Sequence, residues 1–224
     1  MTWIKICGIT NLADAQAAID ANANALGFVF YSKSPRKIDV ETAADIVRHL
    51  PHAVEKVGVF VDAESSRIRE IASQVGLTAV QLHGKQSLES VQQDSRPALE
   101  SVGVSKVIPA IPGESLKHGG VLINRDAPEK VFALLLDSHT NGTLGGTGQI
   151  FDWQGTRAMV QVISLKLPVI VAGGLTSQNV AEPIRVLQPF GVDVSSGVEA
   201  SPGKKDPEKI RAFIQAVRNA DRHS

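Results

Sequence analysis

The sequence predicts a single-domain α/β protein, a (β/α)8 TIM barrel with eight parallel strands. Eight short apolar runs, rich in β-branched residues, alternate with longer segments of helical periodicity. Several runs lack an alternation of polar and apolar residues, as expected of parallel strands that are covered on both faces. Eight such units in 224 residues match the size of a closed barrel. An open, doubly wound sheet is the structural alternative, but it has no reason to contain eight strands.

The expected strands are short and evenly spread along the chain. They cover residues 3–7, 25–30, 55–61, 79–82, 106–111, 132–136, 168–172 and 191–194. No linker or low-complexity stretch separates them, so we expect one domain over residues 1–224.

Helix signals lie between most of these strands. Capping or first-turn residues come before apolar positions at helical spacing, and a proline or glycine often follows. Starts are expected at Asn11, Asp39, Ser65 or Ser66, Trp153, Thr176 and Pro207, and stops at Pro51 and Gly76. Pro97 and Gly103 interrupt the segment 86–105, and a strand-like run at 121–124 interrupts 117–130. The fourth and fifth helices are therefore expected to be short or irregular.

Composition excludes several classes of function. The chain has 23 basic and 23 acidic residues, which argues against a broad basic face for nucleic acid or attraction to an anionic membrane. It has no uncharged apolar stretch of about 18 residues, and the lysine within its first apolar run leads us to expect no signal peptide. The single cysteine, Cys7, excludes an intrachain disulfide framework and a multi-cysteine zinc site. We expect a cytoplasmic protein with no nucleic-acid or membrane partner.

In a (β/α)8 barrel the active site lies at the carboxyl ends of the strands, so polar residues at those ends matter most. The first run places Lys5 and Cys7 on one face, because side chains alternate along a strand. We expect both to face the barrel interior, with the ammonium lowering the pKa of the thiol. A thiolate there would act as a nucleophile or a general base, whereas the alternative is a buried, inert thiol.

Asp137 ends the sixth run and begins a long segment, 138–153, that is rich in glycine. The preceding leucines should desolvate this carboxyl and raise its pKa, which suits a general acid. The alternative is a capped or paired aspartate at a strand end. The segment is typical of an active-site cover, although its composition fits a disordered excursion equally well, and we expect its Gly146 to contact the substrate.

The last two strand ends have the composition of an anion site. Gly173 and Gly174 precede Thr176, an expected helix N-cap, and Ser195, Ser196 and Gly197 follow the eighth strand. Glycines let backbone amides approach an anion, and phosphate sites after strands seven and eight are common in this fold. The alternative is that these residues serve tight-turn geometry alone.

Three further residues are candidates for lining the pocket. Arg36 follows strand two, and its guanidinium can hold a carboxylate through two parallel hydrogen bonds, although most loop arginines are simply solvated. Gln81 and His83 share one side of strand four. The other histidines show no metal-ligand spacing, so we expect no metal site.

Nine stretches of the chain, taken together, resemble the phosphoribosylanthranilate isomerase family of tryptophan biosynthesis. They are KICGIT at 5–10, ALGFVFYSKSPRKI at 25–38, VGVFV at 57–61, VQLHG at 80–84, LLLDS at 134–138, GGTG at 145–148, FDW at 151–153, VAGGLTSQNV at 171–180 and GVDVSSGVEASPGKKD at 191–206. They run in order from end to end of the chain, and residues 86–125 match least well.

The resemblance implies an Amadori rearrangement of N-(5-phosphoribosyl)anthranilate to 1-(2-carboxyphenylamino)-1-deoxyribulose 5-phosphate. It implies that Cys7 is the general base, that Asp137 is the general acid and that Arg36 holds the anthranilate carboxylate. It also implies phosphate binding by Gly173, Gly174, Ser196 and Gly197. The substrate provides its own electron sink, so no cofactor is expected. The only expected partner is this phosphosugar, bound to a monomer or a homodimer.

Three other functions stay open at this point. One is the related isomerase of histidine biosynthesis, or an enzyme with both activities, although that relative resembles a scheme with two aspartates where this chain has Cys7. The second is an aldolase that forms a Schiff base on Lys5. The third is a phosphosugar-binding barrel without catalysis, which would need neither Cys7 nor Asp137.

Overall fold

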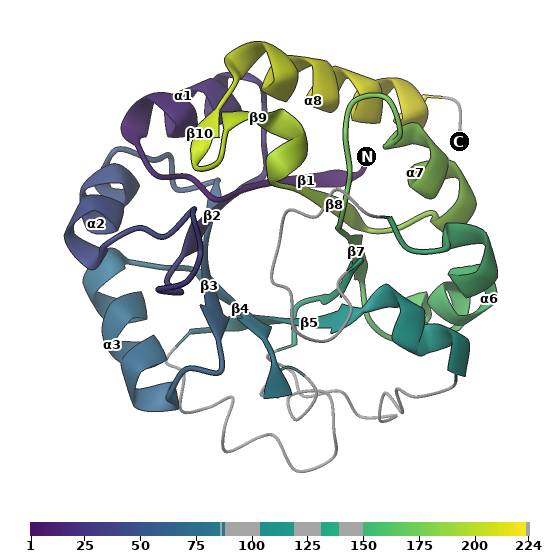
Figure 1. The fold of residues 1–224 in the computed structure, drawn as a ribbon, viewed down its shortest axis with the longest axis horizontal. Helices are drawn as coiled ribbons and strands as arrows, with labels where there is room; N and C mark the ends of the chain where they lie inside the picture. The colour runs from purple at the N-terminus through teal and green to yellow at the C-terminus, as the bar shows by residue number, and fades with distance from the viewer. Residues whose placement is uncertain (86, 88–103, 119–130, 139–149, 223–224) are drawn as a thin grey trace.

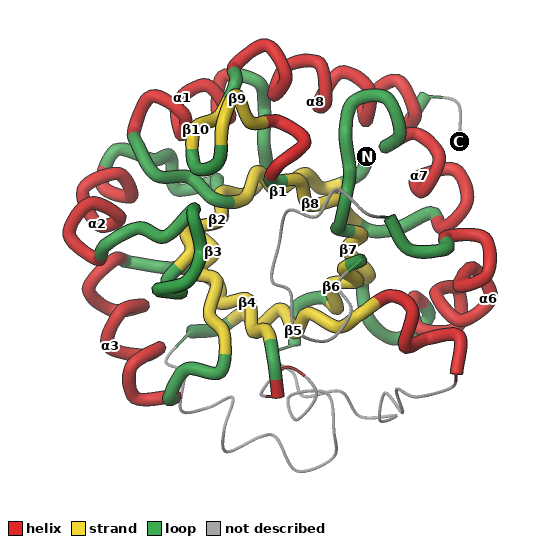
Figure 2. Tube along the Cα trace, viewed as in Figure 1, coloured by secondary structure: helices red, strands yellow, loops and turns green. Residues whose placement is uncertain are grey.

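The computed structural model describes residues 1–85, 87, 104–118, 131–138 and 150–222. Eight parallel strands close into a barrel in the order β1-β2-β3-β4-β5-β6-β7-β8, with β1 paired to β8. The strands form the inner ring and the helices surround it (Figures 1 and 2). The predicted closed barrel is confirmed, and the open sheet is wrong.

The strands lie where the apolar runs predict them, with ends shifted by at most two residues. They are β1 (Trp3–Cys7), β2 (Ala25–Val29), β3 (Glu55–Val61), β4 (Ala79–His83), β5 (Lys106–Pro112), β6 (Leu134–Asp137), β7 (Val169–Val171) and β8 (Gly191–Val194). Local composition is a strong signal here because both faces of every strand are buried.

Six α-helices pack outside the strands within the described residues. They are α1 (Leu12–Asp20), α2 (Val40–Arg48), α3 (Ser65–Val75), α6 (Trp153–Ser164), α7 (Ala181–Leu187) and α8 (Pro207–Asp221). Asn11 and Asp39 cap α1 and α2 through their side chains, and Gly76 ends α3 with a φ of 78°. Pro207 begins α8, as predicted. Helix α3 starts at Ser65 itself, and its N-cap residue, Glu64, makes no side-chain capping bond.

The prediction that Thr176 is a helix N-cap is wrong, because α7 begins five residues later at Ala181. The Asn179 side chain accepts a hydrogen bond from the Thr176 backbone N–H at 2.8 Å and donates one to the Gly174 carbonyl at 3.0 Å. These bonds stabilise a turn in place of a first helical turn. Pro183 also favours the later start. It has no N–H to donate, which is tolerated in the first turn of a helix that begins at Ala181 but would remove a hydrogen bond from a helix that began near Thr176.

Three expectations fall partly outside the described residues. The predicted fourth helix and most of the fifth lie in 86–103 and 119–130, and the described part after β5 is a 3-10 helix, η1 (Gly113–His118). The greater part of the glycine-rich segment, 139–149, is also outside, and Gly146 with it.

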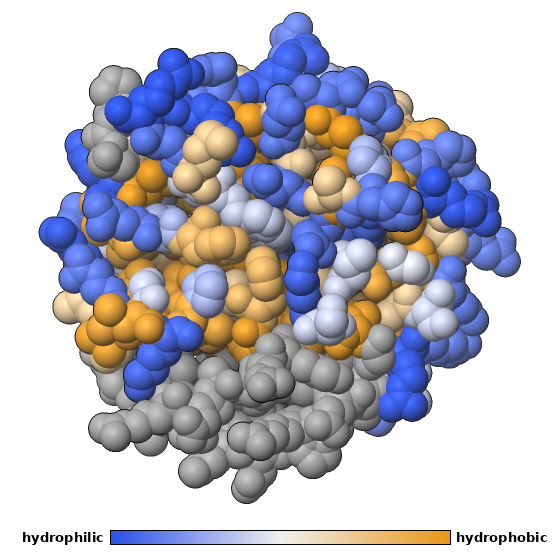
Figure 3. Space-filling model, turned by 180° about the vertical axis from the view of Figure 1, so that it is seen from behind, coloured by the Kyte–Doolittle hydropathy of each residue, from blue (hydrophilic) through white to orange (hydrophobic). Residues whose placement is uncertain are grey.

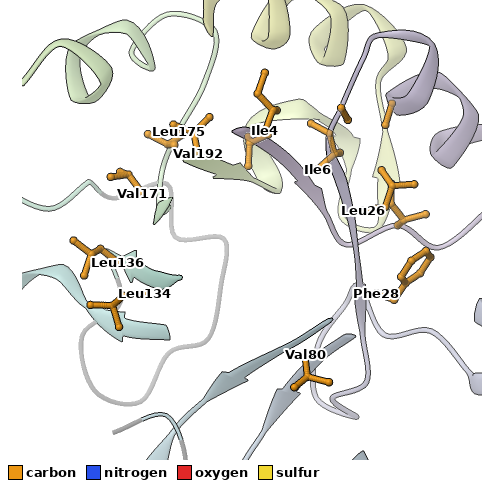
Figure 4. Close-up of a cluster of buried hydrophobic side chains, with 14 of the residues drawn as sticks. Ile4, Ile6, Leu26, Phe28, Val80, Leu134, Leu136, Val171, Leu175 and Val192 are labelled. Atoms are coloured by element: carbon orange, nitrogen blue, oxygen red, sulfur yellow. The ribbon is translucent and has the colours of Figure 1, made fainter. Parts of the chain in front are cut away.

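The core has two layers. The outward side chains of the strands pack against the helices, as the cluster around Ile4, Ile6, Leu26 and Phe28 shows (Figure 4). The inward layer holds mainly small and branched residues. On the opposite side of the molecule from Figure 1, hydrophobic surface is visible among polar residues near the middle of the face (Figure 3).

A small hairpin follows β8 and was not expected from the sequence. After a short 3-10 helix, η2 (Ser196–Val198), strands β9 (Glu199–Ser201) and β10 (Lys204–Lys205) pair antiparallel. The hairpin lies beside α1 and α8 and above the end of β1 in Figure 1. Among the described helices none has the length and apolar character that a membrane span requires.

Candidate active site

A cavity lies at the carboxyl ends of the barrel strands. Its lining includes most of the side chains that the sequence singled out. Those residues are Cys7, Arg36, Gln81, His83, Asp137, Gly173, Gly174, Ser195 and Ser196. Of the remaining two, Gly197 does not line it, and Gly146 lies outside the described residues. Residues from β1, β2, β4, β6, β7 and β8 thus meet at one end of the barrel.

The thiol of Cys7 faces the cavity, and the ammonium of Lys5 lies beneath it. A Cβ built on Gly27 would lie 2.7 Å from Cys7 Sγ and 3.1 Å from Lys5 Cε, so both side chains fill the space beside this glycine. The prediction that both face inward is confirmed: Cys7 is buried at the cavity floor, and Lys5 is fully buried.

The expected effect of Lys5 on the pKa of the Cys7 thiol has the predicted direction, but other effects outweigh it. Burial is the largest single influence and raises the pKa of the Cys7 thiol, Lys5 lowers it, and the carboxylate of Asp193 raises it, so that the pKa lies above its ordinary value. The ammonium is shared, because Lys5 Nζ donates a hydrogen bond to Asp193 Oδ1 at 3.0 Å. In the ligand-free site the thiol form therefore predominates at neutral pH.

Lys5 and Asp193 form a buried ion pair across the closure of the barrel. They are register partners on β1 and β8. Burial alone would lower the pKa of Lys5, but Asp193 and Cys7 raise it above its ordinary value. Burial also raises the pKa of Asp193, and the nearby charge of Asp137 adds to this effect. Three ionisable groups are thus coupled under the cavity.

Asp137 ends β6 at the cavity wall and is half-buried. The Ser138 hydroxyl donates to Asp137 Oδ1 at 3.5 Å. Asp137 and Cys7, at the ends of β6 and β1, line the same cavity. The raised pKa of Asp137 that the sequence suggests stays a prediction.

Two turns form the wall beside β7 and β8. Gly173 and Gly174 have φ values of 85° and 62°, which favour glycine, and a Cβ on Gly173 would lie 2.2 Å from Ser138 Oγ. Gly197 serves a different purpose, because a Cβ there would lie 1.9 Å from the Leu175 carbonyl oxygen. Gly197 thus lets the two turns pack closely without itself reaching the cavity.

Arg36 lines the cavity next to Cys7 and Ser195. A Cβ on Gly8 would lie 2.7 Å from Arg36 Cδ, so the arginine stem crosses over Gly8. The guanidinium makes a fork of two bonds, but to a protein group: Nε and Nη2 donate to the two carboxylate oxygens of Glu199, each at 2.8 Å. As far as the described residues show, Nη1 and the second hydrogen of Nη2 are the donors left for a ligand.

Gln81 and His83 face the cavity from β4, as predicted. Gln81 Nε2 lies 2.7 Å from His83 Nε2, and the pair therefore forms a hydrogen bond. Within the described residues, the buried Gln81 Oε1 has no hydrogen-bond partner. These two residues give the cavity a polar wall. In the same described part of the chain, no three metal-ligating carboxylate, imidazole or thiol groups come together.

Sequence reasoning missed three charged residues of this region: Asp193, Glu199 and Lys205. Asp193 carried a usable signal, since a carboxylate inside the apolar run GVDV should face the barrel interior and β8 must meet β1 in a closed ring. Glu199 and Lys205 had no local sequence signal, because the hairpin that carries them shows no clear strand pattern in the sequence.

The cavity can bind a ligand that has two anionic groups, and its thiol and carboxyl group can transfer protons to and from that ligand. The glycine turns and serines present backbone amides on one side, and Arg36 presents cationic donors on another. A thiol and a carboxyl group lie in the same cavity. Such a pair suits general acid–base chemistry on a small substrate.

Comparison with known proteins gives concordant results. A family model described as N-(5'-phosphoribosyl)anthranilate isomerase matches residues 4–216. A protein of that name from Pseudomonas paraeruginosa is 43% identical over 220 residues, which are 98% of this chain and 96% of that protein. Another from Desulforudis audaxviator is 42% identical over 98% of this chain and all of its own length.

Solved structures show the same likeness. The chain matches a phosphoribosyl anthranilate isomerase from Thermotoga maritima with a TM-score of 0.81 and 39% identity, over 98% of this chain and 100% of that one. It also matches such an isomerase in complex with reduced 1-(o-carboxyphenylamino)-1-deoxyribulose 5-phosphate, with a TM-score of 0.77 and 37% identity over the same shares of the two chains.

Proposed function

Because the chain belongs to the N-(5'-phosphoribosyl)anthranilate isomerase family, we propose that the cavity described above is its active site, with Cys7 and Asp137 as the proton-transfer pair. The enzyme converts N-(5'-phosphoribosyl)anthranilate, an aldose amine, to 1-(o-carboxyphenylamino)-1-deoxyribulose 5-phosphate. The observation that carries the proposal is that these two residues line one cavity together with Arg36 and the glycine turns.

Asp137 acts first, as the general acid. It donates a proton to the ring oxygen of the ribose while the bond from that oxygen to C1 breaks. The amine nitrogen supplies the electron pair, so the product of this step is an open-chain, protonated Schiff base. The half-buried position of Asp137 after three buried leucines supports this role, since partial desolvation favours the protonated acid.

Cys7 acts second, as the general base. The Schiff base makes the hydrogen on C2 acidic, and the thiolate removes it to leave an enolamine that tautomerises to the ketone. Because the pKa of the ligand-free thiol is raised, Cys7 must release its proton to solvent in the complex before it can act as the base. The cationic Schiff base adds to the positive charge of Lys5 and so favours the thiolate at that moment.

The rest of the cavity holds the two ends of the substrate. The anthranilate carboxylate accepts hydrogen bonds from the free edge of Arg36. The phosphate binds the backbone amides around Gly173, Gly174, Ser195 and Ser196, and Gly197 lets these turns approach each other. Gln81 and His83 contribute polar contacts from β4. Binding at both ends holds the sugar between acid and base.

The test is turnover of freshly made substrate by wild type, Cys7→Ser and Asp137→Asn. We expect each variant to lose at least about 100-fold in kcat. Asp62→Asn is the matched control: Asp62 follows β3 at the same end of the barrel but contacts the Lys85 backbone N–H and does not line the cavity. Near wild-type kcat in Cys7→Ser or Asp137→Asn, with the fold intact by circular dichroism, would remove that residue from the mechanism.

We also propose that residues 1–224 form one domain and that the enzyme works in the cytoplasm. Closure of the ring by β1 and β8 supports a single domain, because neither half of the chain could close the barrel alone. For assembly we propose a monomer or a homodimer. One relative from Thermotoga maritima is described as dimeric, and light scattering of the purified protein will decide between the two states.

A further inference from the structure

The hairpin β9–β10 places a buried carboxylate, Glu199, behind the substrate-binding arginine. We propose that Glu199 is a positioning residue, which orients Arg36 so that one edge of its guanidinium faces the anthranilate carboxylate. This inference depends on the proposed role of Arg36 as the carboxylate-binding group.

The geometry fixes the plane of the guanidinium. Glu199 accepts from Arg36 Nε and Nη2 at 2.8 Å each, and both side chains are buried, with 5% and 9% of their surface exposed. Two parallel bonds determine both the direction and the rotation of a planar fork. The opposite edge, which holds Nη1 and one Nη2 hydrogen, is then the part of Arg36 that is free to bind a second carboxylate.

Glu199 is itself held firmly. Its Oε1 accepts from Lys205 Nζ at 3.0 Å and from the Gly203 backbone N–H at 3.3 Å. Its backbone carbonyl accepts from Lys209 Nζ at 2.7 Å. The hairpin is anchored to the barrel as well, because the Thr10 hydroxyl donates to the Gly203 carbonyl at 2.5 Å.

Lys205 joins this cluster to the turn that follows β8. Its ammonium, fully buried, also donates to the Ser195 carbonyl at 3.2 Å, and its backbone N–H donates to Asp14 Oδ2 at 2.7 Å. The hairpin therefore contacts both Arg36 and the serine turn. Arg36 and Ser195 lie close together here, since a Cβ on Gly8 would lie 2.7 Å from Arg36 Cδ and 3.2 Å from Ser195 Oγ.

The charge of the cluster fits an incoming anion. Arg36 and Lys205 share the single carboxylate of Glu199, so one positive charge is in excess among these three side chains. Burial of an ion pair is expensive and by itself gives little stability. Because Arg36 lines the cavity, the excess positive charge of this buried cluster fits ligand binding better than it fits a role in folding.

The test compares two ligands that differ by one carboxylate. One is reduced 1-(o-carboxyphenylamino)-1-deoxyribulose 5-phosphate, and the other is the same compound without the ring carboxylate. The ratio of their dissociation constants, measured by calorimetry, is the carboxylate preference. We expect a preference of at least about tenfold in wild type, as for a charge-assisted pair of hydrogen bonds. In Glu199→Gln we expect most of that preference to be lost, while the carboxylate-free compound binds within about threefold of wild type.

The sign of the effect separates positioning from a role in folding alone and from a simple effect of net charge. If Glu199 matters only for folding, both ligands weaken equally and the preference does not change. If only net charge matters, removal of the negative Glu199 makes the cluster more positive and the preference rises. Either result overturns the proposal. Glu199→Asp keeps the charge with a shorter side chain, and we expect it to retain part of the preference.

Two further variants complete the design. Glu55→Gln is the matched control, since Glu55 binds Lys106 and Thr78 at the start of β3, and we expect wild-type preference there. Arg36→Ala should lose the preference on its own, and adding Glu199→Gln to it should change the preference no further.

If Arg36→Ala keeps the preference, the proposed role of Arg36 fails. If Arg36→Ala loses the carboxylate preference but Glu199→Gln keeps it, the proposed role of Arg36 stands and the positioning role of Glu199 is refuted. Should Glu199→Gln not fold, Glu199→Asp in the presence and absence of Arg36→Ala gives the same comparison.

Discussion

Replacement of Lys5 by methionine tests the electrostatics under the active site directly. The side chain keeps its length and approximate volume, but the ammonium between Cys7 and Asp193 is lost. Lys5 lowers the pKa of the Cys7 thiol through its charge and a hydrogen bond. We therefore expect the pKa of the thiol to rise further in Lys5→Met.

The magnitude follows from the interactions that are lost. A hydrogen bond from a charged donor contributes about 1.5–3 kcal/mol, which corresponds to about one to two pH units in the thiol pKa. Stability should also fall by about 3 kcal/mol, because Asp193 is left buried without its partner. Adding Asp193→Asn should restore part of the stability and lower the thiol pKa again, since Asp193 raises it.

The assay is the rate of alkylation by iodoacetamide as a function of pH in the ligand-free enzyme. Cys7 is the only cysteine of the chain, so the reaction reports on one thiol. Lys56→Met is the control: Lys56 is also buried in a strand, but its ammonium donates to the Pro51 carbonyl at 2.7 Å. A thiol pKa in Lys5→Met equal to or below the wild-type value would refute the reasoning.

Further predictions follow from the site and the fold. The kcat/KM of wild type should give a bell-shaped profile, because acid and base must be in opposite protonation states; a flat profile from about pH 5 to 9 contradicts this. Gly197→Ala should lose about 1–3 kcal/mol in urea unfolding and weaken phosphate binding, since its Cβ would overlap the Leu175 carbonyl. Gly76→Ala should cost about 1 kcal/mol, because Gly76 has a φ of 78°. Burial would raise the pKa of Glu199, but Arg36 and Lys205 lower it below the ordinary value of 4.5. The ionised Glu199 therefore stabilises the fold above pH 4.5, and this stabilisation is lost as the pH falls from 4.5 through the lowered pKa. Glu199→Gln should therefore flatten the acid limb of stability measured by urea unfolding against pH.

Local patterns predicted the scaffold well because the physical causes were local. Each strand is an apolar run buried on both faces, and Asn11 and Asp39 cap their helices with their own side chains. The error at Thr176 came from a competitor a few residues away. Asn179 ties its own side chain to the Gly174 turn and so delays the helix. Capping statistics describe single positions and do not include such bonds.

The electrostatics of the site could not be predicted in the same way, because its ion pairs join distant parts of the chain. Lys5 and Asp193 are 188 residues apart, and Arg36 and Glu199 are 163 apart. A positive neighbour alone suggested a reactive thiolate. The structure adds burial and the carboxylate of Asp193, and both act in the opposite direction on the thiol pKa.

The raised pKa of Cys7 imposes an order on the proposed reaction. If the thiol were ionised in the empty site, proton removal could begin as soon as the substrate bound. With a thiol that keeps its proton, the base becomes competent only when additional positive charge comes near it. Ring opening produces that charge, as the protonated Schiff base, within the same cavity. In this scheme Asp137 acts before Cys7, and a thiol that stays protonated at rest is protected from alkylation or oxidation between turnovers.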